Sequence, residues 1–534
     1  MRIALIYRAL LAPIFGVGLC LSFAPAQAWW FAPVCLAGLW MLIETCGALA
    51  AAVIGLCFGV GWFGAGFWWM MPGIRDNSAA GVGLALALTI ALVLYMSLYP
   101  AIACGLLRWL SGTDHSSDRR VRRWRCVLAA ALWTLSEWAR GQFFGGVPWL
   151  TTGYAQSAGP LHGLAPLIGV FGLTFVTAWM AAEFMHWLLD WTWPDTRADR
   201  LSALVRQCLF PGALLLLGGA GVLLGRIDWT EATGNMLTVR LLQGNLPQQE
   251  KFSQAGFAHA LSTYETLTEN SSAALTVLPE TALSLEWFSL PPVVVAHWQA
   301  LADQRNSTIV LGAVVALTAN AERVSNSALA LLPGASATPP QYGYRYDKEK
   351  LIPIGEAMPS GLEWLSSRLQ LDYATFTAGT RDQPPLSLNA GKIAIGICFE
   401  DLFDTIVADK ARDAGVLLNI TNFAWFTHTT ASAQHLQVGQ MRALETGRWF
   451  MQAANTGLTA LVDPHGVVRA VMPGEETGAL DGSIPMRRGA TPFMRWQNRP
   501  LLFFIAVLLS FALLQKYAAI GRRCGMIAVG ADRK

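Results

Sequence analysis

Three side chains in the second half of this 534-residue chain could together carry out acyl transfer. Glu280 and Cys398 each follow a short apolar run that is typical of a buried β-strand, and Lys348 lies between them in the sequence. A carboxylate can take the proton of a thiol and return it to a leaving group, while an ammonium can lower the thiol pKa and stabilise an oxyanion. We therefore predict that Glu280, Lys348 and Cys398 meet at one rim of a sheet and form an acyl-transfer site.

Each of these residues also has an ordinary alternative role. Glu280 and Lys348 could be solvated surface charges, and a lone cysteine is often a small core residue. The distribution of the nine cysteines favours a chemical role for Cys398, because the other eight lie in or beside strongly hydrophobic segments. If the polar part of the chain faces an oxidising compartment, a solitary thiol there risks oxidation or mispairing, so its presence indicates a function.

The composition indicates that much of the chain faces lipid. Apolar residues make up 54% of the sequence and charged residues only 14%, which departs from the usage of soluble proteins. The net charge of +3 gives no indication of a nucleic-acid partner. Stretches of about 20 apolar residues fit the hydrocarbon core of a bilayer. We predict eight such spans, at residues 8–24, 29–45, 48–70, 81–107, 125–142, 161–189, 207–225 and 499–516.

Basic residues in the short loops predict the orientation of these spans. Lys and Arg cluster before the first span, between the fourth and fifth, between the sixth and seventh, and after the eighth, so that every cluster lies on one side. The positive-inside rule makes that side the cytoplasm. We expect a multi-pass protein of the bacterial cytoplasmic (inner) membrane. Residues 1–226 would form a membrane domain of about seven helices, 227–490 a catalytic domain in the periplasm, and 491–534 a C-terminal transmembrane helix and cytoplasmic tail.

The polar segment between the seventh and eighth spans has the secondary-structure pattern of a separate domain. Short β-type runs occupy residues 237–242, 275–278, 308–311, 392–397 and 416–420. Helix-like segments alternate with them, at residues 253–270, 292–304 and 432–447. This alternation is typical of a layered α/β domain.

Several motifs resemble a known family. Leu278-Pro279-Glu280-Thr281, the Tyr-x-Lys-x-x-Leu-x-Pro-x-Gly-Glu run from 346 to 356, and Ile397-Cys398-Phe399-Glu400 resemble the three motifs of the nitrilase superfamily. Asn419-Ile420-Thr421-Asn422, together with Val147-Pro148-Trp149-Leu150 in the hydrophobic part, resembles its membrane-bound branch, the apolipoprotein N-acyltransferases. The resemblance implies a multi-span α-helical membrane domain and an extracytoplasmic nitrilase-like domain, an αββα sandwich.

The resemblance also implies roles for individual residues. Glu280 would be the base, Lys348 the catalytic lysine and Cys398 the nucleophile, with Glu356 and Glu400 as supporting carboxylates. Three positions depart from the family pattern: Phe399 stands where Tyr is frequent, Phe423 where Asp is common, and Phe252 where a Trp is expected. We expect Phe399 to support the nucleophile. The candidate contacts with lipid or substrate are Phe252, Trp149 and Trp425.

The resemblance implies an enzyme with two lipid substrates. A fatty acyl chain would move from a phospholipid to Cys398 as a thioester, and then to the α-amino group of the diacylglyceryl-cysteine of an apolipoprotein. Two alternatives remain open: a membrane-anchored nitrilase-type amidase or hydrolase, in which water takes the thioester, and a non-catalytic lipid-binding or scaffold protein.

The sequence predicts no cofactor and no metal. No Walker or dinucleotide fingerprint precedes a helix. His428 and His435 have no second ligand at metal spacing, so a structural role is expected for both.

Overall fold

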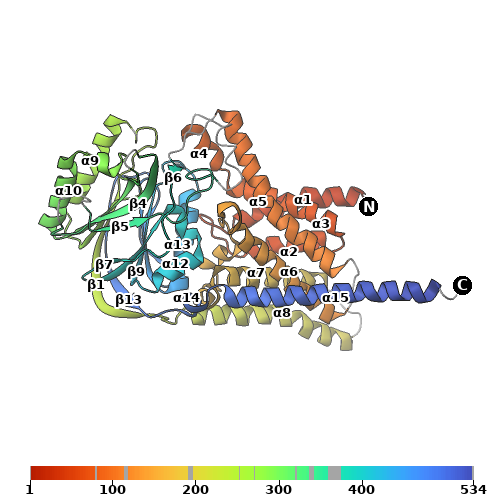
Figure 1. Cartoon of the computed structure of the whole chain (residues 1–534). Coiled ribbons are helices and arrows are strands. Elements are labelled where there is room, and N and C mark those ends of the chain that lie inside the picture. Colours follow the sequence, from red (N-terminus) through yellow and green to blue (C-terminus); the bar gives the residue numbers. More distant parts are fainter. Residues whose placement is uncertain are drawn as a thin grey trace.

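The chain consists of a helical part and an α/β part that lie side by side (Figure 1). The computed structural model describes residues 2–77, 81–112, 118–190, 197–251, 253–269, 271–318, 321–335, 342–358 and 375–531. Both chain ends lie at the end of the helical part that is remote from the α/β part (Figure 1).

The helical part is built from the first 224 residues and the C-terminal helix. Its helices are α1 (Arg2–Cys20), α2 (Phe31–Ile43), α3 (Ala48–Gly66), α4 (Met70–Asn77), α5 (Val82–Ser111), α6 (Arg119–Arg140), α7 (Ala165–Leu189), α8 (Arg197–Leu224) and α15 (Arg499–Ala531). Three short 3-10 turns, Phe143–Gly145, Thr152–Ser157 and His162–Leu164, lie between α6 and α7. Helix α7 is broken near its start, where Gly169 has a φ of +65°.

Six of the eight predicted spans coincide with helices that are long and apolar enough to cross a membrane. Within the described residues these are Ile3–Cys20, Ala48–Gly66, Val82–Ser111, His162–Leu189, Gln207–Leu224 and Arg499–Ala518. The predicted span 29–45 differs, because α2 has only 13 residues and rises about 20 Å. The predicted span 125–142 also differs. It overlaps α6, which ends at Arg140 and whose first half is rich in arginine, so this helix is not apolar enough along its length to be counted with the other six.

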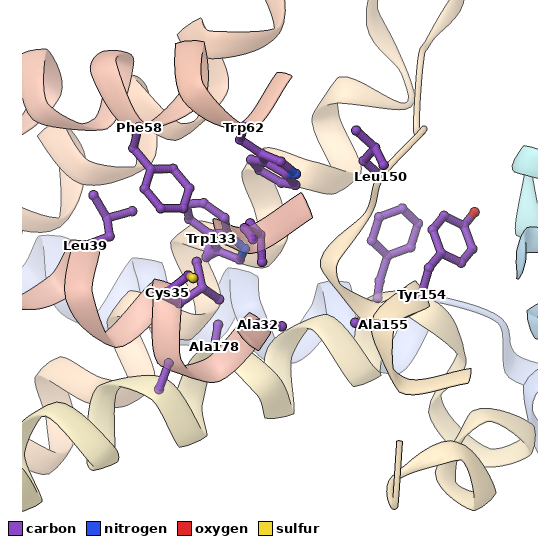
Figure 2. Close-up of a cluster of buried hydrophobic side chains, with 14 of the residues drawn as sticks. Ala32, Cys35, Leu39, Phe58, Trp62, Trp133, Leu150, Tyr154, Ala155 and Ala178 are labelled. Carbon is purple, nitrogen blue, oxygen red and sulfur yellow. The ribbon is translucent and has the colours of Figure 1, made fainter. Parts of the chain in front are cut away.

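Aromatic side chains fill the centre of the helical part. Trp62 of α3 stacks on Trp133 of α6 with 5.7 Å between ring centroids, and Phe58 packs edge-on against both rings (Figure 2). Glycine permits close helix contact on the other side of α3. A Cβ atom at Gly61 would lie 2.2 Å from the carbonyl oxygen of Pro13 in α1. Close packing of large rings and small residues thus fixes how α1, α3 and α6 meet.

The α/β part contains two sheets. The first has the strand order β13 (Gly478–Arg488), β1 (Glu231–Gln243), β2 (Leu275–Val277), β3 (Thr308–Ala316), β4 (Arg323–Leu331) and β5 (Tyr344–Asp347), with β6 (Thr375–Phe376) beside β4. The second has the order β12 (Val468–Met472), β11 (Thr459–Val462), β10 (Trp449–Ala454), β9 (Val416–Thr421), β8 (Gly391–Ile397) and β7 (Leu386–Leu388). Strands β1, β2 and β3 run parallel, as do β8, β9 and β10.

The two sheets pack face to face, with helices on their outer faces. One buried cluster combines Val239 and Val277 of the first sheet with Ile395 and Leu418 of the second. Helices α9 (Gln254–Glu269) and α10 (Pro292–Arg305) cover the first sheet. The second sheet is covered by α12 (Asp404–Ala411), α13 (Ala431–Thr446) and α14 (Pro492–Trp496). The expected αββα sandwich is confirmed.

Helix α13 joins the sandwich to the helical part. Its residues contribute to the hydrophobic cluster under the second sheet and also to the cluster of the helical part. Several buried hydrogen bonds cross this boundary, among them three with distances of 2.7 to 2.9 Å. Gln437 Oε1 accepts from the backbone N–H of Ala24 at 2.9 Å, Gln434 Oε1 from the indole N–H of Trp149 at 2.8 Å, and Glu445 Oε1 from the backbone N–H of Val170 at 2.7 Å. The two parts therefore share a buried, hydrogen-bonded interface.

Candidate active site

The nucleophile predicted from the sequence lies at the carboxyl end of β8. Cys398 is partly buried and opens the 3-10 turn Cys398–Leu402, with a φ of +52°, a backbone conformation that non-glycine residues rarely adopt. Its carbonyl oxygen accepts a hydrogen bond from Asn419 Nδ2 on β9 at 2.9 Å. Parallel strands end at the same edge, so β8 and β9 hold this turn from two sides.

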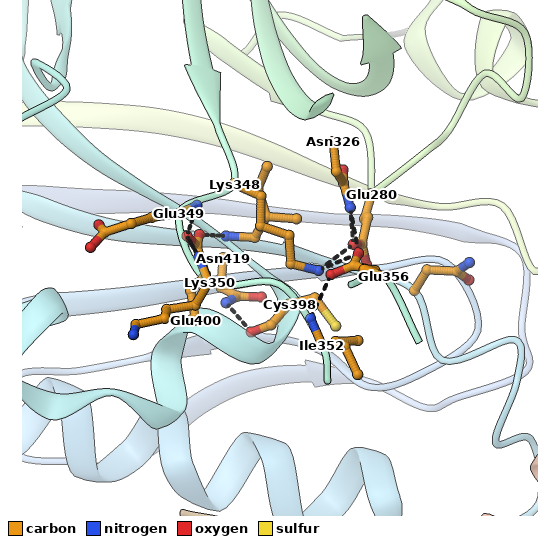
Figure 3. Close-up of polar contacts among 12 residues, drawn as sticks. Glu280, Asn326, Lys348, Glu349, Lys350, Ile352, Glu356, Cys398, Glu400 and Asn419 are labelled. Atoms are coloured by element: carbon orange, nitrogen blue, oxygen red, sulfur yellow. Dashed lines mark hydrogen bonds and ion pairs between the residues drawn. The ribbon is translucent and has the colours of Figure 1, made fainter. Parts of the chain in front are cut away.

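Lys348 lies at the centre of a buried network of charged and amide side chains. Its ammonium is fully buried and donates to Glu280 Oε1 at 3.2 Å and to Glu356 Oε1 at 2.8 Å. Asn326 Nδ2 bridges the same two carboxylates, at 2.7 and 3.1 Å. Figure 3 shows the Cys398 side chain beside this network. The structure thus brings Glu280, Lys348, Glu356 and Cys398 into one site.

The electrostatics of the site keep the resting thiol protonated. Burial, and then the Glu280 carboxylate, raise the pKa of Cys398 well above its usual range, while Lys348 acts in the opposite direction. For Lys348, burial lowers the pKa of the ammonium, but Glu280 and Glu356 outweigh that effect and raise it. The site therefore holds a thiol, a fixed cation and a carboxylate that could take the thiol proton.

Glu400 joins the nucleophile turn to the segment that follows Lys348. Its Oε2 accepts from the backbone N–H of Ile397 at 2.6 Å, and its Oε1 accepts from the backbone N–H of Glu349 at 2.6 Å and from the Tyr346 hydroxyl at 2.7 Å. The carboxylate is 1% exposed. Its position therefore favours a role in holding two active-site loops together rather than in proton transfer.

Comparison with known proteins relates nearly the whole chain to one family. The sequence profile of the apolipoprotein N-acyltransferase N-terminal domain matches residues 15–183, and that of the carbon-nitrogen hydrolases matches residues 238–491. An apolipoprotein N-acyltransferase of Ralstonia nicotianae is 35% identical and aligns with 96% of this chain and 94% of its own. One of Bordetella bronchiseptica is 34% identical over 95% and 96% of the two chains.

The chain belongs to the apolipoprotein N-acyltransferase family. It is an acyltransferase of the nitrilase superfamily, with the apolar helices that a membrane setting requires. Among solved structures, a carbon-nitrogen hydrolase from Helicobacter pylori is 15% identical, with a TM-score of 0.35, over 51% of this chain and 94% of that chain.

Three of the remaining predicted site residues lie in the described part of the chain, and the fourth does not. Phe399 is buried, and its ring packs against Phe403 with 5.4 Å between centroids. Trp149 is 6% exposed and donates to Gln434, and its contact with lipid or substrate stays a prediction. Trp425 is partly buried, and its carbonyl accepts from Asn77 of α4 at 3.3 Å. Phe252 lies outside the described residues.

Two polar residues of the site were missed from the sequence. Asn326 is 4% exposed and lies in the middle of β4. An amide side chain within a strand-like run is the sequence feature by which it could have been predicted. Lys251 is also 4% exposed, and its ammonium lies 3.5 Å from the carbonyl oxygen of Glu280. Burial lowers the pKa of Lys251 to about 8, although Glu280 acts in the opposite direction. No sequence pattern distinguishes this lysine from a surface one.

The described part of the chain holds no group of three or more His, Cys, Asp or Glu side chains arranged as metal ligands. His428 is exposed and pairs with Glu475 at 2.6 Å, whereas His435 is buried and lies within 3.1 Å of the Cys398 carbonyl oxygen. The sequence predicts a structural role for His435, and the structure places its ring against the backbone of the nucleophile.

Proposed function

We propose that this chain moves a fatty acyl group from a phospholipid to Cys398, forming a thioester. It then transfers the group to the α-amino group of the diacylglyceryl-cysteine of an apolipoprotein. Membership of the apolipoprotein N-acyltransferase family supports the overall reaction. The observation that carries the proposal is the buried network in which Lys348 joins Glu280 and Glu356 beside the Cys398 thiol.

The surroundings of Cys398 suit a lipid substrate. Cys398 and Ile352 pack against the same hydrophobic cluster that fills the helical part, and Phe399 and Phe403 belong to that cluster. An acyl chain at the site would therefore lie next to apolar side chains rather than water. Leaving the chain in contact with water would cost about 0.8 kcal/mol for each CH₂.

In the first half-reaction Glu280 takes the proton of the Cys398 thiol. The thiolate attacks the ester carbonyl of the phospholipid, and the Lys348 ammonium stabilises the oxyanion that forms. When the carbon–oxygen bond of the ester breaks, Glu280 returns the proton to the leaving oxygen and lysophospholipid departs.

In the second half-reaction the free amine of the apolipoprotein attacks the thioester. Glu280 takes a proton from the attacking amine as the new amide bond forms. The carbon–sulfur bond breaks, and the proton passes to the departing thiolate of Cys398. Glu356 takes no proton in this scheme, because its Oε1 accepts from Lys348 and its Oε2 from the backbone N–H of Ile352 at 2.9 Å, which orients the ammonium.

A membrane-anchored amidase or hydrolase is the second candidate. The match of residues 238–491 to carbon-nitrogen hydrolases favours it, since the same three residues could pass the thioester to water. The two functions differ in which nucleophile completes the cycle.

An acceptor-omission experiment separates them. With phospholipid alone, we expect about one lysophospholipid per enzyme and then no further release, because water is excluded from the thioester. A diacylated lipopeptide with a free α-amine should restart turnover, and the same peptide with an acetylated amine should not. Continuous release of free fatty acid without any acceptor would refute the acyltransferase and support the hydrolase.

We further propose that the protein lies in the inner membrane, with residues 1–226 as the membrane domain, 227–490 in the periplasm and 491–534 as the last span and cytoplasmic tail. The distribution of basic loops supports this orientation. Reporter fusions provide the test. A fusion near residue 330 should report the periplasm and one at the C-terminus the cytoplasm, and a cytoplasmic signal at 330 would contradict the orientation.

A further inference from the structure

The imidazole ring of His435 contacts the backbone carbonyl of the nucleophile, Cys398. This residue lies in the first turns of α13, is 1% exposed, and has its Nε2 3.1 Å from the carbonyl oxygen of Cys398. The same nitrogen is 3.0 Å from Asp401 Oδ1, and Nδ1 is 3.0 Å from Gln452 Oε1 on β10. Each ring nitrogen therefore faces the polar atom of a buried neighbour.

The chemistry of those neighbours determines the protonation of the ring. A carbonyl oxygen and a carboxylate can only accept, so Nε2 must carry a proton. The orientation of Gln452 is fixed, because its amide nitrogen donates to the carbonyl oxygen of Leu458 at 2.8 Å. Its Oε1 must then face His435 as an acceptor, and Nδ1 must also carry a proton. Only the imidazolium has both.

We propose that His435 is a positioning residue for the nucleophile, held as an imidazolium that donates to the carbonyl oxygen of Cys398. The proposal rests on the proposed function, since it concerns the same thiol. Asn419 donates to that oxygen as well, so two donors from different elements fix the peptide that follows the Cys398 Cα atom. This double anchor stabilises the left-handed backbone conformation of Cys398, which non-glycine residues rarely adopt.

The surroundings of His435 support a positive charge on the ring. Asp401 of the nucleophile turn is the carboxylate that faces it, and the rings of Phe423 and Trp149 lie 5.1 and 5.9 Å from the imidazole centroid. Burial lowers the pKa of His435, but Asp401 outweighs it and raises the pKa above its usual value. Arg442, on the same helix, interacts with Asp401 too, but its ion pair is with Glu445 at 3.0 Å and it also interacts with Asp404, so its charge is largely balanced by carboxylates other than Asp401.

The preceding residue ties this turn of α13 to the helical part. Gln434 Oε1 accepts from the indole N–H groups of Trp149 and Trp69, at 2.8 and 3.4 Å. Adjacent residues of one helix thus contact the helical part and the nucleophile. His435 is therefore held in place by contacts of α13 with the helical part as well as by its own contact with β10.

The first test is the rate of the lysophospholipid burst with phospholipid alone. His435→Gln should lower the burst rate by about tenfold to a hundredfold, the range expected for loss of a charge-assisted hydrogen bond, while the phospholipid concentration that gives half the maximal rate stays unchanged. The matched control is His428→Gln, an exposed histidine outside the site, which should stay within twofold. A burst rate within twofold of the unsubstituted protein in His435→Gln would overturn the proposal.

The second test leaves His435 in place and applies if His435→Gln does not fold. Gln452→Leu removes the acceptor at Nδ1 and should make the imidazolium easier to deprotonate. The burst rate of the unsubstituted protein should fall as the pH rises through the raised pKa of His435. In Gln452→Leu that fall should move to lower pH by at least half a unit, with the rate at low pH kept within about threefold. An unchanged midpoint would overturn the proposal, whereas absence of any burst in the unsubstituted protein would instead refute the proposed function.

Discussion

Replacing Glu356 with glutamine would test how far catalysis depends on the orientation of Lys348. The carboxylate of Glu356 accepts on both oxygens: Oε1 from Lys348 at 2.8 Å and from Asn326 at 3.1 Å, Oε2 from the backbone N–H of Ile352 at 2.9 Å. All three partners are donors. An amide has one accepting oxygen, so in either orientation its NH₂ group faces a donor.

The size of the effect follows from this count. Glu356→Gln removes one negative charge from a buried ammonium and breaks at least one charge-assisted hydrogen bond, a loss of about 1.5–3 kcal/mol. With about 1.36 kcal/mol for each factor of ten, the acylation rate should fall by roughly 10- to 150-fold. Glu280 remains as a partner of Lys348, so activity should be reduced and not abolished.

The assay is the single-turnover release of lysophospholipid from a labelled phospholipid. Glu349→Gln is the matched control, because this carboxylate follows Lys348 in sequence but is not among its hydrogen-bond partners. The control should stay within about threefold of the unsubstituted protein. A Glu356→Gln rate indistinguishable from that of the control would refute the argument that Glu356 orients Lys348.

Three further predictions concern the base, a buried lysine and helix packing. Glu280→Gln should abolish detectable acyl transfer. Phe423→Asp should leave the turnover rate within about tenfold of that of the unsubstituted protein, because the new carboxylate would face the cationic ring of His435. Equal losses of turnover in the two variants would contradict this difference in their roles. The pKa of Lys251 is lowered to about 8 from 10.5, so between those values the unfolded chain binds more protons and folding stability rises with pH. The thermal midpoint of Lys251→Met, measured in detergent, should therefore exceed that of the unsubstituted protein most clearly at pH 7, and by less at pH 10; a difference independent of pH would exclude this cause. Gly61→Ala should lower the thermal midpoint because its Cβ would lie 2.2 Å from the Pro13 carbonyl oxygen, while Gly64→Ala, with nothing within 4 Å, should not; equal midpoints would contradict the close contact of α1 and α3.

Local sequence patterns predicted the parts of the fold that depend on local interactions. The runs at 237–242, 275–278, 308–311, 392–397 and 416–420 correspond to β1, β2, β3, β8 and β9, and the helix expected at 432–447 is α13, shifted by one residue. These segments carry periodic apolar residues between turn residues, and this local pattern is what predicts secondary structure from sequence.

The remaining strands could not be found in this way. Strands β10 and β11 are buried along almost their whole length, so they show no alternation of apolar and polar residues. Pairing of β1 with β13 joins residues about 250 positions apart, such as Leu237 and Ile484, and no local pattern encodes it. Two predicted spans do not coincide with an apolar helix of membrane-crossing length: α2 is too short, and the arginines of α6 lower its hydropathy.

The active-site residues also divide into those that a local motif predicts and those that only tertiary contacts bring to the site. Glu280, Lys348 and Cys398 were predicted because each lies in a recognisable motif, and the structure places them together. Asn326 and His435 lie within a strand and a helix that come close to the site only in the folded chain. Their contribution depends on tertiary contacts, which the spacing of residues along the chain does not reveal.

The covalent intermediate is the central claim, and mass spectrometry of the peptide that contains Cys398 tests it most directly. After incubation with one defined phospholipid and no acceptor, the account predicts a mass increase equal to one fatty acyl group on that peptide. The increase should be absent in Cys398→Ser and should disappear when a lipopeptide with a free α-amine is added. Release of lysophospholipid and acylation of the lipopeptide without any adduct on Cys398 would contradict the account, because the acyl group would then pass directly from donor to acceptor.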